Sequence, residues 1–350
     1  MSKVNGQRVV IIDRTLPELL SAADKMSRLD ILDFCWMLKN AGVDIIEADT
    51  RLISKLGKLP QGLDFLLEVE SLEDLHICKR LRNRSCVLKP QLLLMDEVVE
   101  CIREHSLHAE LDITASSIED LYGLEMLSTF PGIQLISGIR LTGLGRLDTT
   151  EWVSVVKRLK GILEKKIDIC PEQTLSMGNA ILLEAALNGM EYVTATFTGY
   201  GQKRKYASTE ILLTALKVLY GDARKSNLQM LPDLRELFAR HVHVKIPDNT
   251  PVIGKHIFMY ESGIHADGID KDPNTYEPYD PAIVGQKRKL VIGKHSGRLS
   301  IAKKLAELGM EAERADMTQL LQEVKELSVQ MNRSLDNEEI MDAYTRSCLH

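Results

Sequence analysis

The sequence predicts an α/β protein in which a (β/α)8 TIM barrel is followed by a smaller, mainly helical region. Short apolar runs alternate with amphipathic segments along the first two thirds of the chain, and no glycine-rich phosphate loop follows the first run. Repeated βα units without such a loop favour a barrel over a dinucleotide-binding sheet. A chain of 350 residues can bury the core of such a barrel and still form a second region. We expect the barrel over residues 1–225, and a linker with a C-terminal subdomain over residues 226–350.

Seven strands are expected where short runs of β-branched and other apolar residues occur. They are VVIID (9–13), VDIIEA (43–48), CVLKP (86–90), LHAELDI (107–113), IQLISGI (133–139), KIDIC (166–170) and YVTATF (192–197). An eighth strand could be LHICKR (75–80), although these residues also fit the end of a helix that begins near Gly62.

Amphipathic helices are expected between the strands. One buried helix face is indicated by Trp152, Val155, Val156 and Leu159. Asparagine and glycine at 40–42 and at 188–189 are typical of helix ends. The barrel is expected to end near Gly221.

From about Asn227 the pattern changes to helices joined by a proline-bearing connector. Helices are expected at LPDLRELFARHV, LSIAKKLAELG and MTQLLQEVKELSVQM. The stretch 259–285 is long for a structureless loop, and loops of that length are commonly functional or disordered. His241 and His243 have a spacing that suits a metal ion, but no third ligand motif accompanies them. We interpret them as part of a surface strand or helix end.

Composition and charge exclude several classes of protein. The net charge is −6 and no basic face is evident, so nucleic acid is not expected as a partner. No signal peptide or membrane span is evident, and we expect a cytoplasmic protein. The six cysteines lie far apart without a CxxC pair. They are interpreted as reduced thiols in the core rather than as zinc ligands or disulfides.

Three motifs in the C-terminal region carry a family resemblance. They are ESGIHADG (261–268), TYEPYDPAIVG (275–285) and LVIGKHSG (290–297). In this order and spacing they resemble the C-terminal subdomain of homocitrate synthase, of the nitrogen-fixation type, and less closely that of 2-isopropylmalate synthase. The likeness extends back through TGYGQKRKYASTEILLTAL (198–216) and GVDIIEAD (42–49), so it covers most of the chain.

The resemblance implies an acyltransferase of the DRE-TIM metallolyase type. Its barrel joins acetyl-CoA to a 2-oxo acid, here 2-oxoglutarate, by a Claisen-type condensation and then hydrolyses the thioester. The reaction needs a divalent cation such as Mg²⁺, Mn²⁺ or Zn²⁺, a cationic donor for the developing alkoxide and a base for the acetyl methyl group. The resemblance also implies a dimer whose C-terminal subdomains reach across to the partner barrel.

Most of the barrel residues that this chemistry needs are replaced. The family motif DxTLRDGEQ supplies a metal-binding aspartate and a catalytic arginine, whereas this chain reads DRTLPELLS. Asp13 is retained as the metal ligand, but Pro17 stands at the arginine position. Arg14, at an extended strand end, is expected to point to a different side from the lost arginine.

The other metal ligands of the family are replaced as well. Its HxHND motif falls on Asp168 and Cys170 in place of two histidines, and the asparagine of GERxGN falls on Tyr206. Asp13, Asp168 and Cys170, with Glu47 nearby, could form a different metal site. Ligation by Asp and Cys without histidine is uncommon, however, so Asp168 is interpreted as part of a helix N-terminus and Cys170 as a buried thiol. No metal is expected in this chain.

The C-terminal motifs are intact. By resemblance His265 and Tyr276 form part of the acid/base apparatus that acts on the acetyl group of the neighbouring subunit. Glu47, Glu261 and Ser262 are the substrate-binding candidates. Short basic runs at 203–205 and 286–290 could attract the phosphates of coenzyme A, but such runs are usually solvated faces.

The functional hypothesis is a homocitrate-synthase-like subunit that is inactive or very weak alone. It is expected to lend its C-terminal subdomain to an intact homologue in a heterodimer, with a homodimer as the other possible assembly. Two alternatives are open at this point. One is a condensing or lyase enzyme with altered chemistry in the same barrel, with or without a metal ion, and the other is a non-catalytic regulatory paralogue.

Overall fold

The computed structural model describes residues 8–19, 26–78, 85–145, 151–201 and 205–348. The chain divides into two compact units, a barrel unit (Met1–Lys245) and a C-terminal unit (Ile246–His350). No helix in the described ranges is long and apolar enough to cross a membrane.

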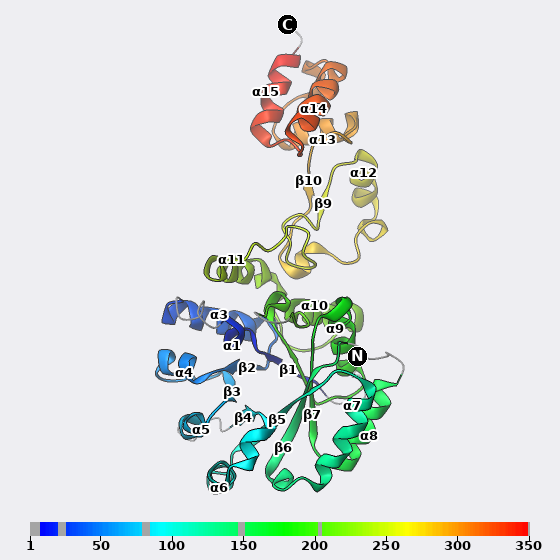
Figure 1. The fold of residues 1–350 in the computed structure, drawn as a ribbon. Helices are drawn as coiled ribbons and strands as arrows, with labels where there is room; N and C mark the ends of the chain where they lie inside the picture. The colour runs from blue at the N-terminus through cyan, green and yellow to red at the C-terminus, as the bar shows by residue number, and fades with distance from the viewer. Residues whose placement is uncertain (1–7, 20–25, 79–84, 146–150, 202–204, 349–350) are drawn as a thin grey trace. The chain divides into compact units, whose positions relative to one another are not determined.

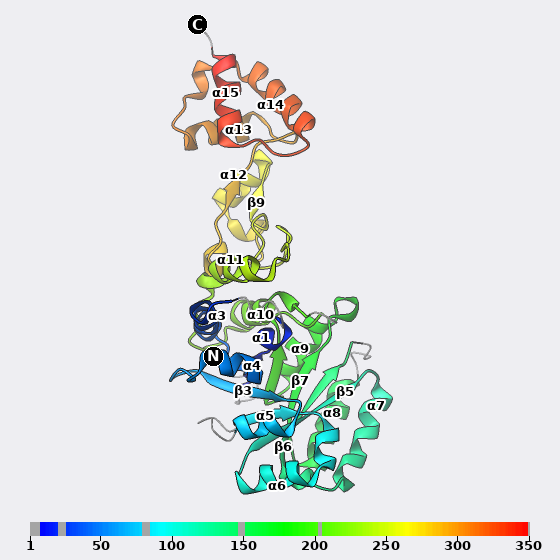
Figure 2. The same ribbon diagram turned by 60° about the vertical axis from the view of Figure 1, so that its left-hand side comes forward.

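The barrel unit contains a closed barrel of eight parallel strands with helices on its outside (Figures 1 and 2). The strands are β1 (Val10–Asp13), β2 (Ile45–Ala48), β3 (Asp64–Val69), β4 (Ser85–Leu88), β5 (His108–Ala115), β6 (Ile136–Gly143), β7 (Lys166–Pro171) and β8 (Tyr192–Ala195). Strand β8 pairs with β1, with Val10 opposite Tyr192, and this closes the barrel. The predicted (β/α)8 fold is confirmed, and seven strands lie at the expected places.

The expected position of the eighth strand is wrong. That strand is β3, whereas part of the segment 75–80 belongs to helix α5 (Leu72–Cys78) and its last two residues lie outside the described ranges. The alternative is confirmed in part, since residues 75–78 form the end of a helix. That helix does not begin near Gly62, which lies in a turn with a φ of 90° before β3. Four of the six residues of β3 are buried, on both faces of the strand. Its sequence therefore lacks the alternation that marks a half-buried strand.

The helices of the barrel unit cover the outside of the strands. They are α1 (Thr15–Leu19), α3 (Arg28–Ala41), α4 (Thr50–Leu56), α5 (Leu72–Cys78), α6 (Asp96–Glu104), α7 (Ile118–Gly123), α8 (Trp152–Leu163), α9 (Gly178–Leu187), α10 (Thr209–Tyr220) and α11 (Leu231–Val242). Helix α8 buries all four residues of the predicted face. Helix α3 ends where the sequence indicates, because Gly42 adopts a φ of 119° and donates its N–H to the carbonyl of Leu38.

Helix α11 belongs to the barrel unit. It packs on α3, where the rings of Phe238 and Phe34 stack with centroids 6.3 Å apart. Phe197, which follows β8, meets Phe238 edge to face at 5.5 Å. Because these contacts tie α11 to the barrel, the division between the two compact units falls after Lys245.

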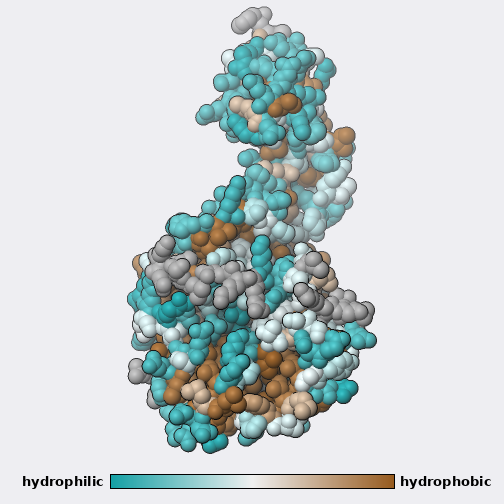
Figure 3. All heavy atoms as spheres, in the orientation of Figure 1, coloured by the Kyte–Doolittle hydropathy of each residue, from teal (hydrophilic) through white to brown (hydrophobic). Residues whose placement is uncertain are grey.

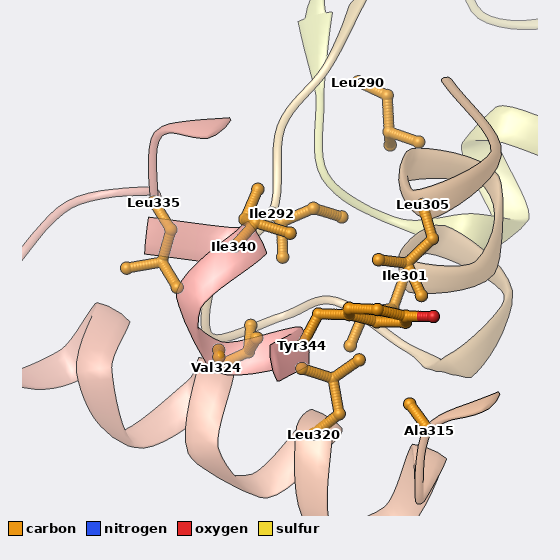
Figure 4. Close-up of a cluster of buried hydrophobic side chains, with 11 residues drawn as sticks. Leu290, Ile292, Ile301, Leu305, Ala315, Leu320, Val324, Leu335, Ile340 and Tyr344 are labelled. Carbon is orange, nitrogen blue, oxygen red and sulfur yellow. The ribbon is translucent and has the colours of Figure 1, made fainter. Parts of the chain in front are cut away.

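The C-terminal unit has its own hydrophobic core. Its elements are β9 (Met259–Tyr260), α12 (Gly263–Lys271), β10 (Lys289–Leu290), α13 (Arg298–Glu307), α14 (Met317–Met331) and α15 (Asn337–Ser347). Side chains of α13, α14 and α15, such as Ile301, Leu320 and Ile340, pack together with Leu290 (Figure 4). The stretch 259–285 is ordered, since it contains β9, α12 and short 3₁₀ turns. In the view of Figure 3, hydrophilic side chains cover most of the visible surface of the C-terminal helices.

Candidate functional site

The barrel interior changes from apolar to charged toward the carboxyl ends of the strands. Ile12, Leu66 and Val87 form an apolar cluster inside the barrel. Because successive side chains of a strand alternate between its two faces, the residue two positions after each of Ile12 and Leu66 also points inward. These residues are Arg14 and Glu68. The end of the barrel that normally carries chemistry is therefore lined by charged side chains.

Arg140 of β6 is the centre of a fully buried ion network. Its Nη1 donates to Oε2 of Glu47 on β2 at 2.5 Å, and its Nε donates to Oδ2 of Asp168 on β7 at 2.6 Å. Asp168 also accepts a hydrogen bond from Oγ1 of Thr194 on β8. All three charged side chains are fully buried. One guanidinium thus links three strands, which stabilises the closed barrel and balances two carboxylates that water does not reach.

Arg14 is the second buried cation of the barrel. Its Nη2 lies 3.2 Å from Oε1 of Glu18 and 3.7 Å from Oε1 of Glu68. Its Nη1 lies 4.0 Å from the Cys170 sulfur, and its guanidinium carbon is 5.0 Å from the ring centre of Tyr206. The Tyr206 side chain also hydrogen-bonds with Glu18. We call these five residues, Arg14, Glu18, Glu68, Cys170 and Tyr206, the barrel mouth.

Asp13 does not have the surroundings of a metal ligand. One of its carboxylate oxygens accepts the N–H of Thr15 at 2.9 Å, and the other accepts the hydroxyl of Thr209 on α10 at 2.6 Å. Burial raises the pKa of Asp13 to about 6, although these hydrogen bonds lower it. Asp13, the family metal ligand that this chain retains, therefore joins the end of β1 to the start of α10 through its two carboxylate oxygens.

The other positions assigned to metal ligands do not fit a divalent cation either. Asp168 is committed to Arg140 and Thr194. Burial raises the pKa of the Cys170 thiol to about 12, although Arg14 lowers it, whereas a cysteine ligand must be a thiolate. Among the described residues, no group of three or more His, Cys, Asp and Glu side chains could hold a metal ion. No step of a reaction is therefore assigned to a metal ion in this barrel.

Glu47 is not placed to contact a substrate. Its side chain is fully buried between the two arginines, with Oε2 on Arg140 and Oε1 3.9 Å from the Nε of Arg14. This position corrects the expectation that Glu47 binds substrate. A more accessible charged pair is formed by Lys89 and Asp112, whose Nζ and Oδ2 atoms lie 2.7 Å apart.

His265 and Tyr276 meet in the C-terminal unit. His265 lies on α12 and is exposed, and the Tyr276 side chain is also exposed. Their ring centres are 4.6 Å apart with the planes tilted by 45°. Helix α12 can approach Tyr276 so closely because of Gly268, where an added Cβ would lie 2.2 Å from Cε2 of Tyr276. The two candidate catalytic residues therefore form one pair that is open to solvent within this unit.

Glu261 and Ser262 organise the segment before this pair. The Glu261 carboxylate accepts the N–H of His295 at 2.5 Å, and its carbonyl accepts the Ser300 hydroxyl at 3.0 Å. Ser262 caps α12 by accepting the N–H of Ile264 at 3.3 Å. These contacts tie the ESGIHADG motif to LVIGKHSG and to α13. A role for either residue in substrate binding stays a prediction.

The remaining candidates have ordinary structural surroundings. His241 and His243 stand at the end of α11, as interpreted from the sequence. Arg288 of the basic run 286–290 pairs with Glu277 at 2.7 Å. Most of the other basic run, 203–205, lies outside the described residues. All six cysteines are free thiols and five are buried, which confirms their interpretation.

Comparison with solved structures finds the same barrel fold in other proteins. It is similar to hydroxymethylglutaryl-CoA lyase from Pseudomonas aeruginosa, with a TM-score of 0.57 over 68% of this chain and 94% of that chain. The sequence identity is 12%, so this likeness shows the fold alone.

Comparison of sequences identifies the family. The family model described as homocitrate synthase post-HMGL domain-like matches residues 252–332. The chain is 31% identical over 346 residues to the homocitrate synthase omega subunit of Clostridium pasteurianum, covering 97% of this chain and 96% of that protein. It is 29% identical over 323 residues to homocitrate synthase AksA of Methanocaldococcus jannaschii, covering 91% and 75% respectively. The chain belongs to the homocitrate synthase family, as its motifs predict.

Proposed function

We propose that this chain is a subunit of a homocitrate synthase and that its own barrel is not catalytic. It supplies His265 and Tyr276 to the active site of an intact partner chain. The reaction served is the condensation of acetyl-CoA with a 2-oxo acid, most simply 2-oxoglutarate. The observation that carries the proposal is the contrast between an open His265–Tyr276 pair and a barrel mouth filled by its own side chains.

The C-terminal pair has the chemistry that the proposal needs. An imidazole can serve as a general acid or base, and the neighbouring phenol can donate a hydrogen bond or relay a proton. Neither ring is enclosed within this unit, so both can reach a group that another chain presents. Acetyl-CoA deprotonation requires such a group beside the acetyl methyl.

The barrel argues against a second, independent active site in the same chain. A 2-oxo acid needs accessible cationic donors for its carboxylate, but Arg140 is fully buried and Arg14 lies beneath Tyr206 with most of its surface covered. Both guanidinium groups face carboxylates of the protein itself. The relative from Clostridium pasteurianum is an omega subunit, which also favours a multi-subunit enzyme.

Mixing experiments test the proposal. Coenzyme A release from acetyl-CoA and 2-oxoglutarate is measured for this chain, for an intact homocitrate synthase, and for the two co-expressed and purified as a complex. We expect no turnover by this chain alone and a higher rate for the complex than for the homologue alone. A positioned acid or base typically contributes about 10²- to 10⁴-fold, so His265→Ala in this chain should abolish the gain.

Matched variants separate the proposal from its alternatives. His256→Ala removes another exposed histidine of the C-terminal unit and should keep the gain. Tyr206→Phe alters the barrel mouth without emptying it and should also keep the gain. If Tyr206→Phe removes the activity and His265→Ala does not, the chemistry lies in this barrel. If no complex forms and no gain is seen, the subunit proposal fails.

A further inference from the structure

The barrel mouth has a cation at its centre even though its metal ligands are replaced. The Arg14 guanidinium reaches Glu18, Glu68 and Glu47, with nitrogen to oxygen distances of 3.2, 3.7 and 3.9 Å. These carboxylates come from α1, β3 and β2. The Arg14 side chain is only 7% exposed. One buried positive charge therefore faces three carboxylates from separate elements.

The Arg14 guanidinium lies near positions where the family resemblance places ligands of the metal ion. Arg14 also contacts Cys170 and the face of Tyr206, at the positions where the family resemblance places a histidine and an asparagine that bind metal. The Arg14 side chain therefore points into the barrel mouth. Its guanidinium lies close to two positions, Cys170 and Tyr206, that correspond to metal ligands of the family.

The electrostatics of the barrel mouth favour a guanidinium over a divalent cation. Carboxylates held close together in a region shielded from water repel one another and need a counter-charge. A guanidinium is protonated at all physiological pH values, so it supplies that charge permanently. It also repels a divalent cation, and within the described part of the chain its Nε atom has no hydrogen-bond partner.

We propose that Arg14 is an internal substitute for the divalent cation, so that this barrel folds without a metal ion and excludes one from its mouth. The inference goes beyond the proposed function, because it holds whether or not the chain assists a partner. It assigns Arg14 a positioning and charge-balancing role rather than a catalytic one. Removing its charge should convert the mouth into an acidic pocket that attracts a divalent cation.

Thermal unfolding with and without MnCl₂ tests this inference on the full chain. Mn²⁺ should leave the Tm of the wild-type chain unchanged. Arg14→Met should lower the Tm in the absence of metal, and Mn²⁺ should then raise it by at least about 2 °C, because a ligand that binds only the folded state stabilises it. Titration calorimetry should show Mn²⁺ binding to Arg14→Met at least about tenfold more tightly than to wild type.

The control is Arg224→Met, which removes another buried arginine of the barrel unit. Arg224 pairs with Asp44 and Asp222 and donates to the carbonyl of Gly42. Its loss should lower the Tm without creating a response to Mn²⁺. Arg14→Gln, which keeps a hydrogen-bond donor, provides a second neutral variant in case Arg14→Met does not fold. Stoichiometric Mn²⁺ in the dialysed wild-type chain, or an equal Mn²⁺ response in all folded variants, overturns the inference.

Discussion

At the scale of residues, the barrel interior is stabilised by buried charges that are paired with one another. Arg140 and Arg14 together face Glu47, while Asp168 completes the network around Arg140. In a site shielded from water, the loss of one member leaves the others without a partner. The arginines therefore matter mainly because the carboxylates around them cannot be solvated.

Arg140→Met should lower the free energy of unfolding of the chain by about 3–5 kcal/mol, because Glu47 and Asp168 remain buried without their cation. Urea unfolding followed by circular dichroism measures the change. Arg158→Met is the control, since Arg158 forms a surface pair with Glu125 and is 62% exposed. The control should lose less than about 1 kcal/mol. Equal losses for the two variants would show that burial of the network adds nothing.

Gly268→Ala should separate the geometry of the C-terminal pair from its stability. An added Cβ meets the Tyr276 ring at 2.2 Å, so the exposed ring must shift and its present contact with His265 changes. Alanine has a higher helix propensity than glycine, so the free energy of unfolding should not fall by more than about 0.5 kcal/mol. In the co-purified complex, coenzyme A release should fall toward the level of His265→Ala.

The control for this change is Gly161→Ala in α8, where an added Cβ meets nothing within 4 Å. It should leave the rate of the complex unchanged. A full rate for Gly268→Ala would mean that the contact between the two rings has no part in the reaction.

At the scale of elements, the spacing of apolar residues correctly predicted the helices and strands that bury only one face. Helix α8 buries Trp152, Val155, Val156 and Leu159 and was correctly placed. Strand β3 was missed because its apolar run fits either a buried strand or a buried helix. Helix α12 was missed for a different reason, since ESGIHADG combines two glycines with few apolar residues. Its helix depends on the Ser262 cap and on packing against α13.

The start of α10 gives a prediction for pH dependence. Glu210 is buried there, and burial raises its pKa from 4.5 to about 7, although a hydrogen bond from the Thr198 N–H lowers it. Both folded and unfolded states are protonated well below pH 4.5, whereas above pH 7 the folded state holds a buried charge. The contribution of Glu210 to stability therefore falls as pH rises from about 5 to 8.

Glu210→Gln should remove this contribution, which is on the order of 3 kcal/mol between pH 5 and 8 at about 1.4 kcal/mol per pKa unit. Urea unfolding at the two pH values should show a smaller fall in stability for the variant than for wild type. Glu97→Gln, at an exposed position on α6, should follow the wild-type dependence. An identical dependence for Glu210→Gln would mean that Glu210 ionises normally in the folded protein.

At the scale of the whole molecule, the sequence predicted the barrel, the helical C-terminal unit and the family. It could not predict which charged side chains meet inside the barrel. Glu47, Arg140 and Asp168 lie on three strands far apart in the sequence, and only closure and register bring them together. The hydrogen bonds of Asp13 to Thr15 and Thr209 could not be predicted either, because a motif position shows the residue type but not its partners.

The central claim is that this chain completes the active site of another chain. Its most direct test is complementation of an intact homocitrate synthase in which the histidine equivalent to His265 has been replaced by alanine. Each chain alone should release no coenzyme A above background. The co-purified pair should regain activity, because one chain contributes a complete barrel and the other contributes His265 and Tyr276. Pairing the same damaged homologue with His265→Ala of this chain should give no activity. Failure of the wild-type chain to restore activity in a stable complex, or equal restoration by His265→Ala, would contradict the account.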